Sequence, residues 1–163
     1  MIFVNRNKLL NTIQIIAFTH RQFNFDEIGL FHLDDRERID ALTNLKTNLD
    51  IDELMYLSTC NRVEFIISQE KKITRNFVEK LIKQLLADQL PTNFKNIADR
   101  AEIINNKAAV NHIFSVASSI DSLVVGEREI ITQVRKAFEE CRENNLCGDV
   151  IRVLVQSTIF TAK

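Results

Sequence analysis

The chain of 163 residues is about the size of one average domain; 45% of its residues are hydrophobic and 26% are charged. This composition excludes an intrinsically disordered protein, and the sequence contains no apolar run long enough to span a bilayer. The net charge of −1, from 21 basic and 22 acidic residues, excludes a strong overall positive field but leaves a nucleic-acid partner open. Because no signal-peptide pattern follows the N-terminus, we expect a cytoplasmic protein.

Glycine and cysteine usage limits the chemistry further. The chain has three glycines, Gly29, Gly126 and Gly148, so neither a G-x-G-x-x-G dinucleotide loop nor a P-loop can form. A nucleotide needed for catalysis would therefore bind to a domain outside this sequence. The three cysteines are an odd number without a secretion signal, which argues against a disulfide framework.

Up to residue 106, predicted strands and helices alternate. β-Branched and apolar runs predict strands, and apolar residues at spacings of three and four predict amphipathic helices. In chain order we expect a strand over 12–18, at least one helix within 26–49, strands over 54–57 and 63–67, a helix over 73–90 and a strand over 101–104. Asp34 and Asp35 suit the N-terminus of the first helix, and Pro91 ends the second. The order β-α-β-β-α-β is typical of a ferredoxin-like sandwich.

After residue 106 the pattern is helical. The spacing of apolar residues predicts helices over 107–117, over 127–144 and from 149 onward. We therefore predict an α+β fold, in which a ferredoxin-like part over residues 1–106 is followed by a packed helical part over 107–163 of the same domain.

The polar connection Ser58-Thr-Cys-Asn-Arg62, between two apolar strands, holds the best candidate for catalysis. A thiolate is a nucleophile, and the positive charge of Arg62 near Cys60 would lower the pKa of the thiol. A turn at the end of a strand holds such a residue firmly and leaves it accessible. The turn alone also fits a cysteine with a purely structural role.

The histidines and the other cysteines carry weaker signals. His112 is of the type that usually serves as the acid–base partner of a catalytic cysteine, although its local pattern alone favours a histidine on a helix surface. His20 and His32 show no spacing typical of zinc ligands, so we expect no metal site. We expect Cys141 in the core, because it lies on an apolar helix face, and we assign no role to Cys147.

Two longer segments together resemble the glutamyl-tRNA reductase family. Leu57-Ser-Thr-Cys-Asn-Arg-Val-Glu64 is similar to the family's S-T-C-N-R-x-E signature. His112-Ile-Phe-Ser-Val-Ala-Ser-Ser-Ile-Asp-Ser-Leu-Val-Val-Gly-Glu127 is similar to its H-L-F-x-V-A-S-G-L-D-S-x-V-x-G-E stretch, and Gln133-Val-Arg135 continues in register with its Q-V-K. Two long motifs in the same order form a specific resemblance.

The resemblance implies the catalytic domain of a longer enzyme. In that family, an NADPH-binding Rossmann domain and a helical dimerisation domain follow the catalytic domain. The family reduces the glutamyl ester of glutamyl-tRNA to glutamate-1-semialdehyde for tetrapyrrole biosynthesis. We therefore expect this chain to be the catalytic domain alone, with NADPH bound by a domain that the sequence lacks. The implied partners are glutamyl-tRNA, a second copy of the chain in a full-length homodimer, and the next enzyme of the pathway. The resemblance implies no membrane partner.

The resemblance also assigns roles to single residues. Cys60 would attack the ester carbonyl and form a thioester, Arg62 would pair with a carboxylate of the glutamyl group, and His112 would donate a proton or polarise the ester. Further positions that match family substrate contacts are Thr59, Asn61, Ser122, Glu127, Arg128, Glu129 and Gln133. The family's G-E-P-Q is replaced by Gly126-Glu-Arg-Glu129, which puts an acid at the position of an amide. A non-catalytic module that binds glutamyl-tRNA or a regulatory partner is the alternative hypothesis.

Overall fold

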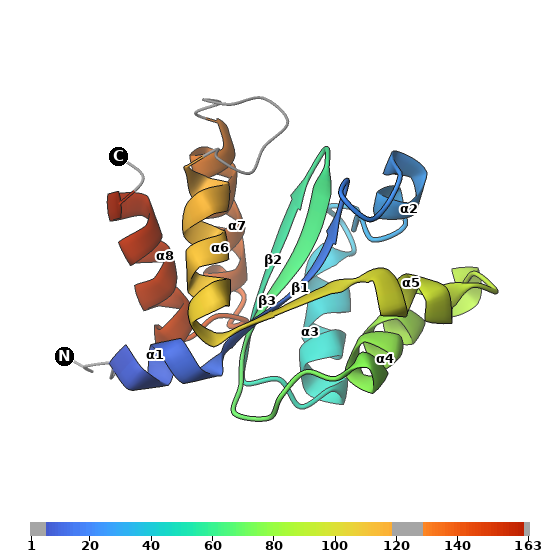
Figure 1. The fold of residues 1–163 in the computed structure, drawn as a ribbon, viewed down its shortest axis with the longest axis horizontal. Helices are drawn as coiled ribbons and strands as arrows, with labels where there is room; N and C mark the ends of the chain where they lie inside the picture. The colour runs from blue at the N-terminus through green and yellow to red at the C-terminus, as the bar shows by residue number, and fades with distance from the viewer. Residues whose placement is uncertain (1–5, 119–128, 162–163) are drawn as a thin grey trace.

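In the computed structural model, which describes residues 6–118 and 129–161, the described chain forms a four-stranded antiparallel sheet between two layers of helices (Figure 1). The strands are β1 (Ile13–Thr19), β2 (Glu53–Thr59), β3 (Arg62–Ser68) and β4 (Glu102–Asn105). They are arranged in the order β2-β3-β1-β4, and each neighbouring pair is antiparallel. The predicted α+β class is therefore confirmed.

Helices cover both faces of this sheet. One layer contains α2 (Phe25–Gly29), α3 (Arg38–Asn48), α4 (Arg75–Leu86) and α5 (Phe94–Arg100), with a 3₁₀ turn over Ala87–Gln89. The other layer contains α1 (Arg6–Thr12), α6 (Asn106–Ala117), α7 (Glu129–Glu143) and α8 (Asp149–Thr161), on the opposite side in Figure 1. Because both faces are covered, every residue of β1 and β3 is buried, which explains their nearly continuous apolar sequences.

The sheet presents different side chains to the two layers, because successive residues of a strand point to opposite faces. On the α3 side, the Phe65 ring packs against Tyr56 and, edge-on, against Phe18, with centroids 5.4 Å and 6.4 Å apart. Phe18 in turn stacks on Phe31 at 3.9 Å. Glu64, the neighbour of Phe65, lies on the α6 side, so β3 carries an aromatic cluster on one face and a polar group on the other.

The prediction of at least one helix within 26–49 is confirmed, and the structure has two helices in this segment. The first is the short helix α2, and α3 starts only at Arg38, later than the acidic pair at 34 and 35 suggested. The carboxylate of Asp34 accepts the N–H of Arg36, so it closes the turn that precedes α3 instead of capping the helix. Asp34 therefore marks a turn, because aspartate favours turns as well as helix N-termini.

Other helix bounds also differ from the prediction. The predicted helix over 73–90 is interrupted after Leu86, because Ala87 adopts a φ of 36°, outside the range of an α-helix. Helices α1 and α5 were not predicted. Each has seven residues, too few for apolar spacing to give a clear helical pattern.

Glu53, the first residue of β2, joins the sheet to α8. Its carboxylate accepts the N–H groups of Gly148, Val150 and Ile151 at 2.9, 3.1 and 2.9 Å. These N–H groups at a helix start have no partner within the helix, so the carboxylate caps it. A Cβ atom at Gly148 would lie 2.8 Å from a Glu53 carboxylate oxygen, which explains the glycine.

The loop between α7 and α8 lies along the outer edge of β2. The Leu54 N–H donates to the Leu146 carbonyl at 2.9 Å, and the Cys147 thiol donates to the Leu54 carbonyl at 3.3 Å. A hydrogen bond with Cys141, together with burial, raises the pKa of Cys147, so its thiol stays a neutral donor. Cys141 is buried, as predicted.

Candidate active site

Cys60 and Asn61 form the two-residue turn of the β2–β3 hairpin, which is tighter than the predicted 58–62 connection because Thr59 and Arg62 already pair in the sheet. The Thr59 hydroxyl donates to the Asn61 side-chain oxygen at 2.9 Å. The N–H of His20, directly after β1, donates to the Asn61 carbonyl at 3.1 Å. Asn61 is buried while Cys60 is exposed, so the thiol lies at the tip of a firmly held turn.

A buried ionic network lies behind this turn. Arg62 is 2% exposed and donates through Nη1 to Glu64 Oε1 at 2.9 Å, and Glu64 itself is fully buried. Nε2 of His112, on α6, lies 2.9 Å from the same carboxylate oxygen, and its side chain is 12% exposed. The structure therefore brings Arg62 and His112 together through one shared carboxylate, and His112 is not a solvated surface residue.

Glu64 is the site residue that sequence reasoning missed. It belongs to the signature-like segment, but no role was assigned to it. The signal was its place in an apolar strand, two residues after an arginine, because a carboxylate in a buried strand needs a charged partner. Its second oxygen, Oε2, is buried and has no hydrogen-bond partner among the described residues.

The other predicted substrate contacts fall into three groups. Thr59 and Asn61 flank Cys60 in the hairpin. Gln133 lines a cleft beside β2, and Glu129 is exposed at the first residue of α7. Ser122, Glu127 and Arg128 lie outside the described residues.

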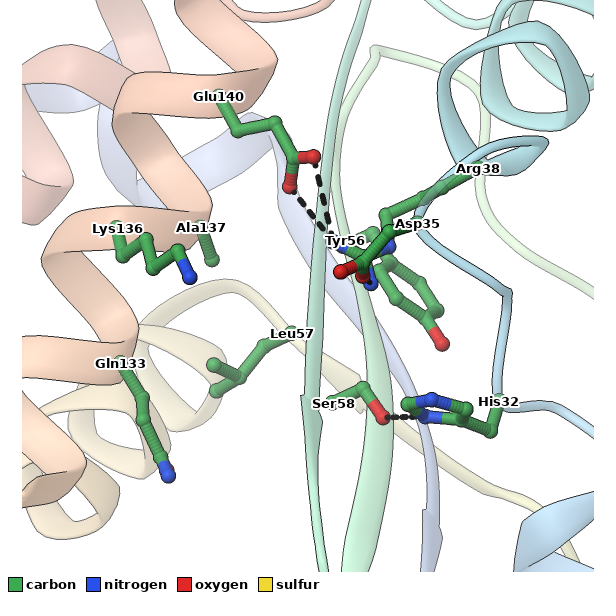
Figure 2. A pocket seen from close by; sticks show the side chains of 10 residues that line it. All are labelled: His32, Asp35, Arg38, Tyr56, Leu57, Ser58, Gln133, Lys136, Ala137 and Glu140. Carbon is green, nitrogen blue, oxygen red and sulfur yellow. Dashed lines mark hydrogen bonds and ion pairs between the residues drawn. The ribbon is translucent and has the colours of Figure 1, made fainter.

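The cleft beside β2 has a volume of about 180 Å³ and separates the start of α3 from α7 (Figure 2). Arg38 forms an ion pair with Asp35 and binds the Glu140 carboxylate at 3.0 Å. Burial is the largest single influence and would lower the pKa of Arg38, but the hydrogen bond with Glu140 and the negative charges of Glu140 and Asp35 together outweigh it, so the pKa is raised. The carboxylates of Asp35 and Glu140 neutralise the charge of Arg38. The Arg38–Glu140 ion pair mainly holds the start of α3 to α7 across the cleft.

A second pocket, of about 290 Å³, adjoins Cys60 on the side of α2. Its lining residues are Phe25, Ile28, Gly29, His32, Ser58, Thr59, Cys60 and Val63. His32 Nδ1 lies 3.0 Å from the Ser58 hydroxyl, so a hydrogen bond holds these two polar side chains of the pocket wall in place. Cys60 thus lies between this pocket and the Arg62–Glu64–His112 network.

Within residues 6–118 and 129–161, no three His, Cys, Asp or Glu side chains gather closely enough to hold a metal ion. No helix in the same ranges is long and apolar enough to cross a membrane.

Known proteins are similar to this chain in both sequence and fold. The family model described as glutamyl-tRNAGlu reductase, N-terminal domain, matches residues 16–163. A glutamyl-tRNA reductase from Nitratiruptor sp. is 36% identical over 137 residues, which cover 82% of this chain and 31% of that protein. A glutamyl-tRNA reductase from Campylobacter concisus is 35% identical over 145 residues, which cover 86% and 32%. The chain therefore spans about a third of the length of the curated relatives it matches.

A solved structure gives the same result for the fold. The glutamyl-tRNA reductase from Methanopyrus kandleri aligns with a TM-score of 0.71 at 23% sequence identity, over 93% of this chain and 33% of that one. At this identity the likeness concerns the fold, whereas the family model and the curated relatives concern the sequence. On that sequence evidence, the chain belongs to the family of glutamyl-tRNA reductase N-terminal domains.

Proposed function

We propose that this chain is the part of a glutamyl-tRNA reductase that takes the glutamyl group from glutamyl-tRNA, with Cys60 as the nucleophile. The observation that carries the proposal is the exposed Cys60 thiol on a tightly held turn, next to a buried network of Arg62, Glu64 and His112. Rigid support and solvent access are the two structural conditions for a nucleophile on a loop.

In the proposed reaction, the Cys60 thiolate adds to the ester carbonyl carbon. The tetrahedral adduct then collapses, the bond between this carbon and the ribose oxygen breaks, and the oxygen takes up a proton and leaves with the tRNA. The products are a thioester on Cys60 and free tRNA. His112 is the proposed group that donates a proton or polarises the ester, and Glu64 orients its ring through Nε2.

Recognition of the glutamyl carboxylate is assigned to Arg62, whose planar guanidinium suits a carboxylate. Its bond with Glu64 supports this role, because it fixes the direction of the side chain. We assign further substrate contacts, on the family resemblance, to Thr59, Asn61, Ser122, Glu127, Arg128, Glu129 and Gln133.

Reduction belongs to another part of the full-length enzyme. The family uses NADPH, which supplies the hydride that converts the thioester to glutamate-1-semialdehyde. The three glycines of this chain cannot form a dinucleotide loop, so its residues do not fit NADPH. We therefore expect this chain to form the thioester, or to hydrolyse the ester slowly, without reducing it.

The test is mass spectrometry of the intact chain after brief incubation with glutamyl-tRNA and an acid quench. We expect a glutamyl adduct on the parent and on Cys147→Ser, which removes a thiol far from the turn, and none on Cys60→Ser. Released glutamate without an adduct would replace the thioester with direct hydrolysis. Binding of the tRNA with neither adduct nor release would favour the non-catalytic binding module.

The architecture of the enzyme is also part of the proposal. We infer a ferredoxin-like sandwich over residues 1–106, with the helical part over 107–163 belonging to the same domain. The order β2-β3-β1-β4, with helices between β1 and β2 and between β3 and β4, supports this assignment. The full-length protein is proposed to form a homodimer in the cytoplasm and to contact the next enzyme of the pathway.

A further inference from the structure

A pocket at the start of α4 lies far from the site described above. It has a volume of about 180 Å³, and the polar residues that matter in its lining are Asp50, Gln69, Lys71, Lys72, Asn76 and Lys80. Figure 1 shows the start of α4 near the end of the sheet opposite to the β2–β3 turn. The seven residues of β3 lie between them, which corresponds to a separation of about 20 Å. A ligand in this pocket would therefore not touch the Cys60 thiol.

Positive charge dominates this pocket. Lys71 pairs with the Asp50 carboxylate at 3.1 Å, but the two side chains are 82% and 85% exposed, so the pair is weak. Lys72 and Lys80 form no ion pair within the described residues, and Asp50 is the one acidic side chain among the lining residues that the structure describes. The excess of lysine over aspartate attracts an anion.

The first turn of α4 adds backbone donors to the lysines. The Thr74 hydroxyl accepts the Phe77 N–H at 3.3 Å, whereas the N–H of Asn76 donates no hydrogen bond within the part of the chain that the structure describes. This twelve-residue helix has no acidic side chain in its first turn, so nothing there offsets the positive end of its dipole. Free N–H groups at a helix start, together with lysines, are the groups that bind phosphate.

Two buried glutamines fix the loop that carries Lys71 and Lys72. Gln14 on β1 is 2% exposed, and its amide donates to the carbonyls of Gln69 and Lys71 at 3.2 and 2.9 Å. The same amide accepts the Ile73 N–H at 2.7 Å. Because the interior of the protein holds this loop, little conformational freedom is lost when it binds a ligand.

Gln69 leaves one acceptor unused in the wall of the pocket. The residue is 5% exposed, and its Oε1 accepts no hydrogen bond within residues 6–118 and 129–161. Its Nε2 donates to the Lys71 carbonyl at 2.9 Å, which sets the orientation of the amide, since a flipped amide would bring two oxygens together. A buried acceptor needs a donor. Phosphate ester oxygens are acceptors, so the donor has to be a hydroxyl on the group that carries the phosphate.

We propose that this pocket binds a sugar phosphate. The phosphate lies between Lys72, Lys80 and the Asn76 N–H, and a sugar hydroxyl donates to Gln69 Oε1. Phe77, which is half-buried in the lining, provides an apolar wall for the sugar ring. The same chemistry is present in an RNA strand and in a free nucleotide or sugar phosphate. The site goes beyond the proposed function, because it contacts neither the thiol nor the glutamyl group.

The first measurement is an NMR titration of the isotope-labelled chain with ribose 5-phosphate, ribose and methyl phosphate. Ribose 5-phosphate should shift the Asn76 amide signal until it saturates, and ribose should leave it unchanged. Methyl phosphate should bind about threefold more weakly, because it has no sugar hydroxyl for Gln69. The double variant Lys72→Gln with Lys80→Gln should bind ribose 5-phosphate about tenfold more weakly.

Two further variants separate the contacts. The control pair Lys95→Gln with Lys107→Gln makes the same change in net charge at exposed positions outside the pocket and should keep the parent affinity. Gln69→Met removes the unused acceptor, while the Lys71 carbonyl keeps its hydrogen bond from Gln14. This variant should bind ribose 5-phosphate and methyl phosphate equally well, and an amide spectrum like that of the parent shows that it is folded.

Deacylated tRNA distinguishes the two sources of the ligand. Its affinity is measured by fluorescence anisotropy at one fixed salt concentration. A loss of about tenfold in the double lysine variant, but not in the control pair, would identify an RNA strand as the ligand. Unchanged tRNA binding with lost ribose 5-phosphate binding would identify a free sugar phosphate. The site is overturned if ribose 5-phosphate shifts no signal and tRNA binding is unchanged, or if the shifts persist in the double variant.

Discussion

Glu64 shares one carboxylate oxygen between Arg62 and His112 while being fully buried. Taking an ion pair out of water costs several kcal/mol, and the attraction between the partners roughly offsets this cost. The pair therefore adds little net stability compared with apolar residues of the same shape. What it supplies is a fixed direction for the guanidinium and the imidazole, which are the groups proposed to meet the substrate.

Removing only the charge of Glu64 tests this reasoning. Glu64→Gln keeps the shape but leaves Arg62 as a buried charge with a weaker partner, so the free energy of unfolding should fall by about 3 kcal/mol. Urea denaturation measures the loss. Glu70→Gln, at an exposed position after β3, is the matched control and should change stability by less than ~0.5 kcal/mol. An equal denaturation midpoint for Glu64→Gln and the parent would contradict the importance of this network for the fold.

At the site, features that depend only on neighbouring residues of the chain could be predicted from the sequence. Cys60 and its turn were predictable because the polar run lies between two apolar strands. The role of Glu64 was not, because it depends on His112, which is 48 positions away in the chain and is brought close only when α6 packs on the sheet. The pocket at Phe25 was missed for the same reason, since its two walls come from α2 and from the distant hairpin.

At the scale of elements, two glycines give opposite predictions: Gly148, just before α8, and Gly29, the last residue of α2. In Gly148→Ala, the new Cβ would displace the Glu53 carboxylate that caps α8, so we expect a loss of about 1–2 kcal/mol. In Gly29→Ala, the Cβ would meet open space, and a gain of up to ~0.5 kcal/mol is expected because alanine favours the helix. Thermal and urea unfolding of both variants provide the comparison. A Gly148→Ala chain as stable as Gly29→Ala would show that the cap is dispensable.

The ion pair between α2 and α5 predicts a pH dependence. Arg100 donates to Glu27 at 2.5 Å, and this hydrogen bond lowers the pKa of Glu27 from 4.5. A lowered folded-state pKa stabilises the protein above the unfolded pKa, and this contribution is lost as the pH falls through the folded value. The cost of Arg100→Gln should therefore be about 0.5 kcal/mol larger at neutral pH than at pH ~2, where only the contacts with the Gln22 carbonyl and the Phe23 ring are still lost. Urea titrations of parent and variant at the two pH values measure the difference, and a cost that does not change with pH would contradict it.

The elements themselves were predictable where burial imposes a pattern. The strands appeared as apolar runs because helices cover both faces of the sheet. The long α7 was predictable from one apolar face, which includes Val134, Phe138 and Cys141. The division between α2 and α3 was not, because the apolar spacing continues across turns whose geometry depends on tertiary contacts such as the Tyr56 hydroxyl with the Phe31 carbonyl.

At the scale of the whole molecule, the helical part completes the core of the α/β part. The buried apolar residues form one continuous cluster, to which α6, α7 and α8 contribute alongside the strands. The face of β1 and β3 that carries Ile15 and Ile66 is covered by this layer. The strands and the helices α6, α7 and α8 therefore share one core.

A chain that ends at residue 106 should not fold on its own, because one face of its sheet would be exposed to water and Glu64 would lose His112. Circular dichroism and urea titration of this shortened chain test the expectation. A cooperative unfolding transition with native-like strand content would contradict it and would make residues 1–106 an independent domain.

The α7–α8 loop on the outer edge of β2 has a consequence for how copies of this protein behave toward one another. An uncovered edge strand is a template for pairing with the strand of another molecule, which leads to aggregation. Here Leu146 and Cys147 occupy the backbone groups of Leu54, so the first part of β2 cannot recruit a neighbour. A loop that contributes nothing to the proposed chemistry thus covers the start of the edge strand, where the strand of another molecule would otherwise pair.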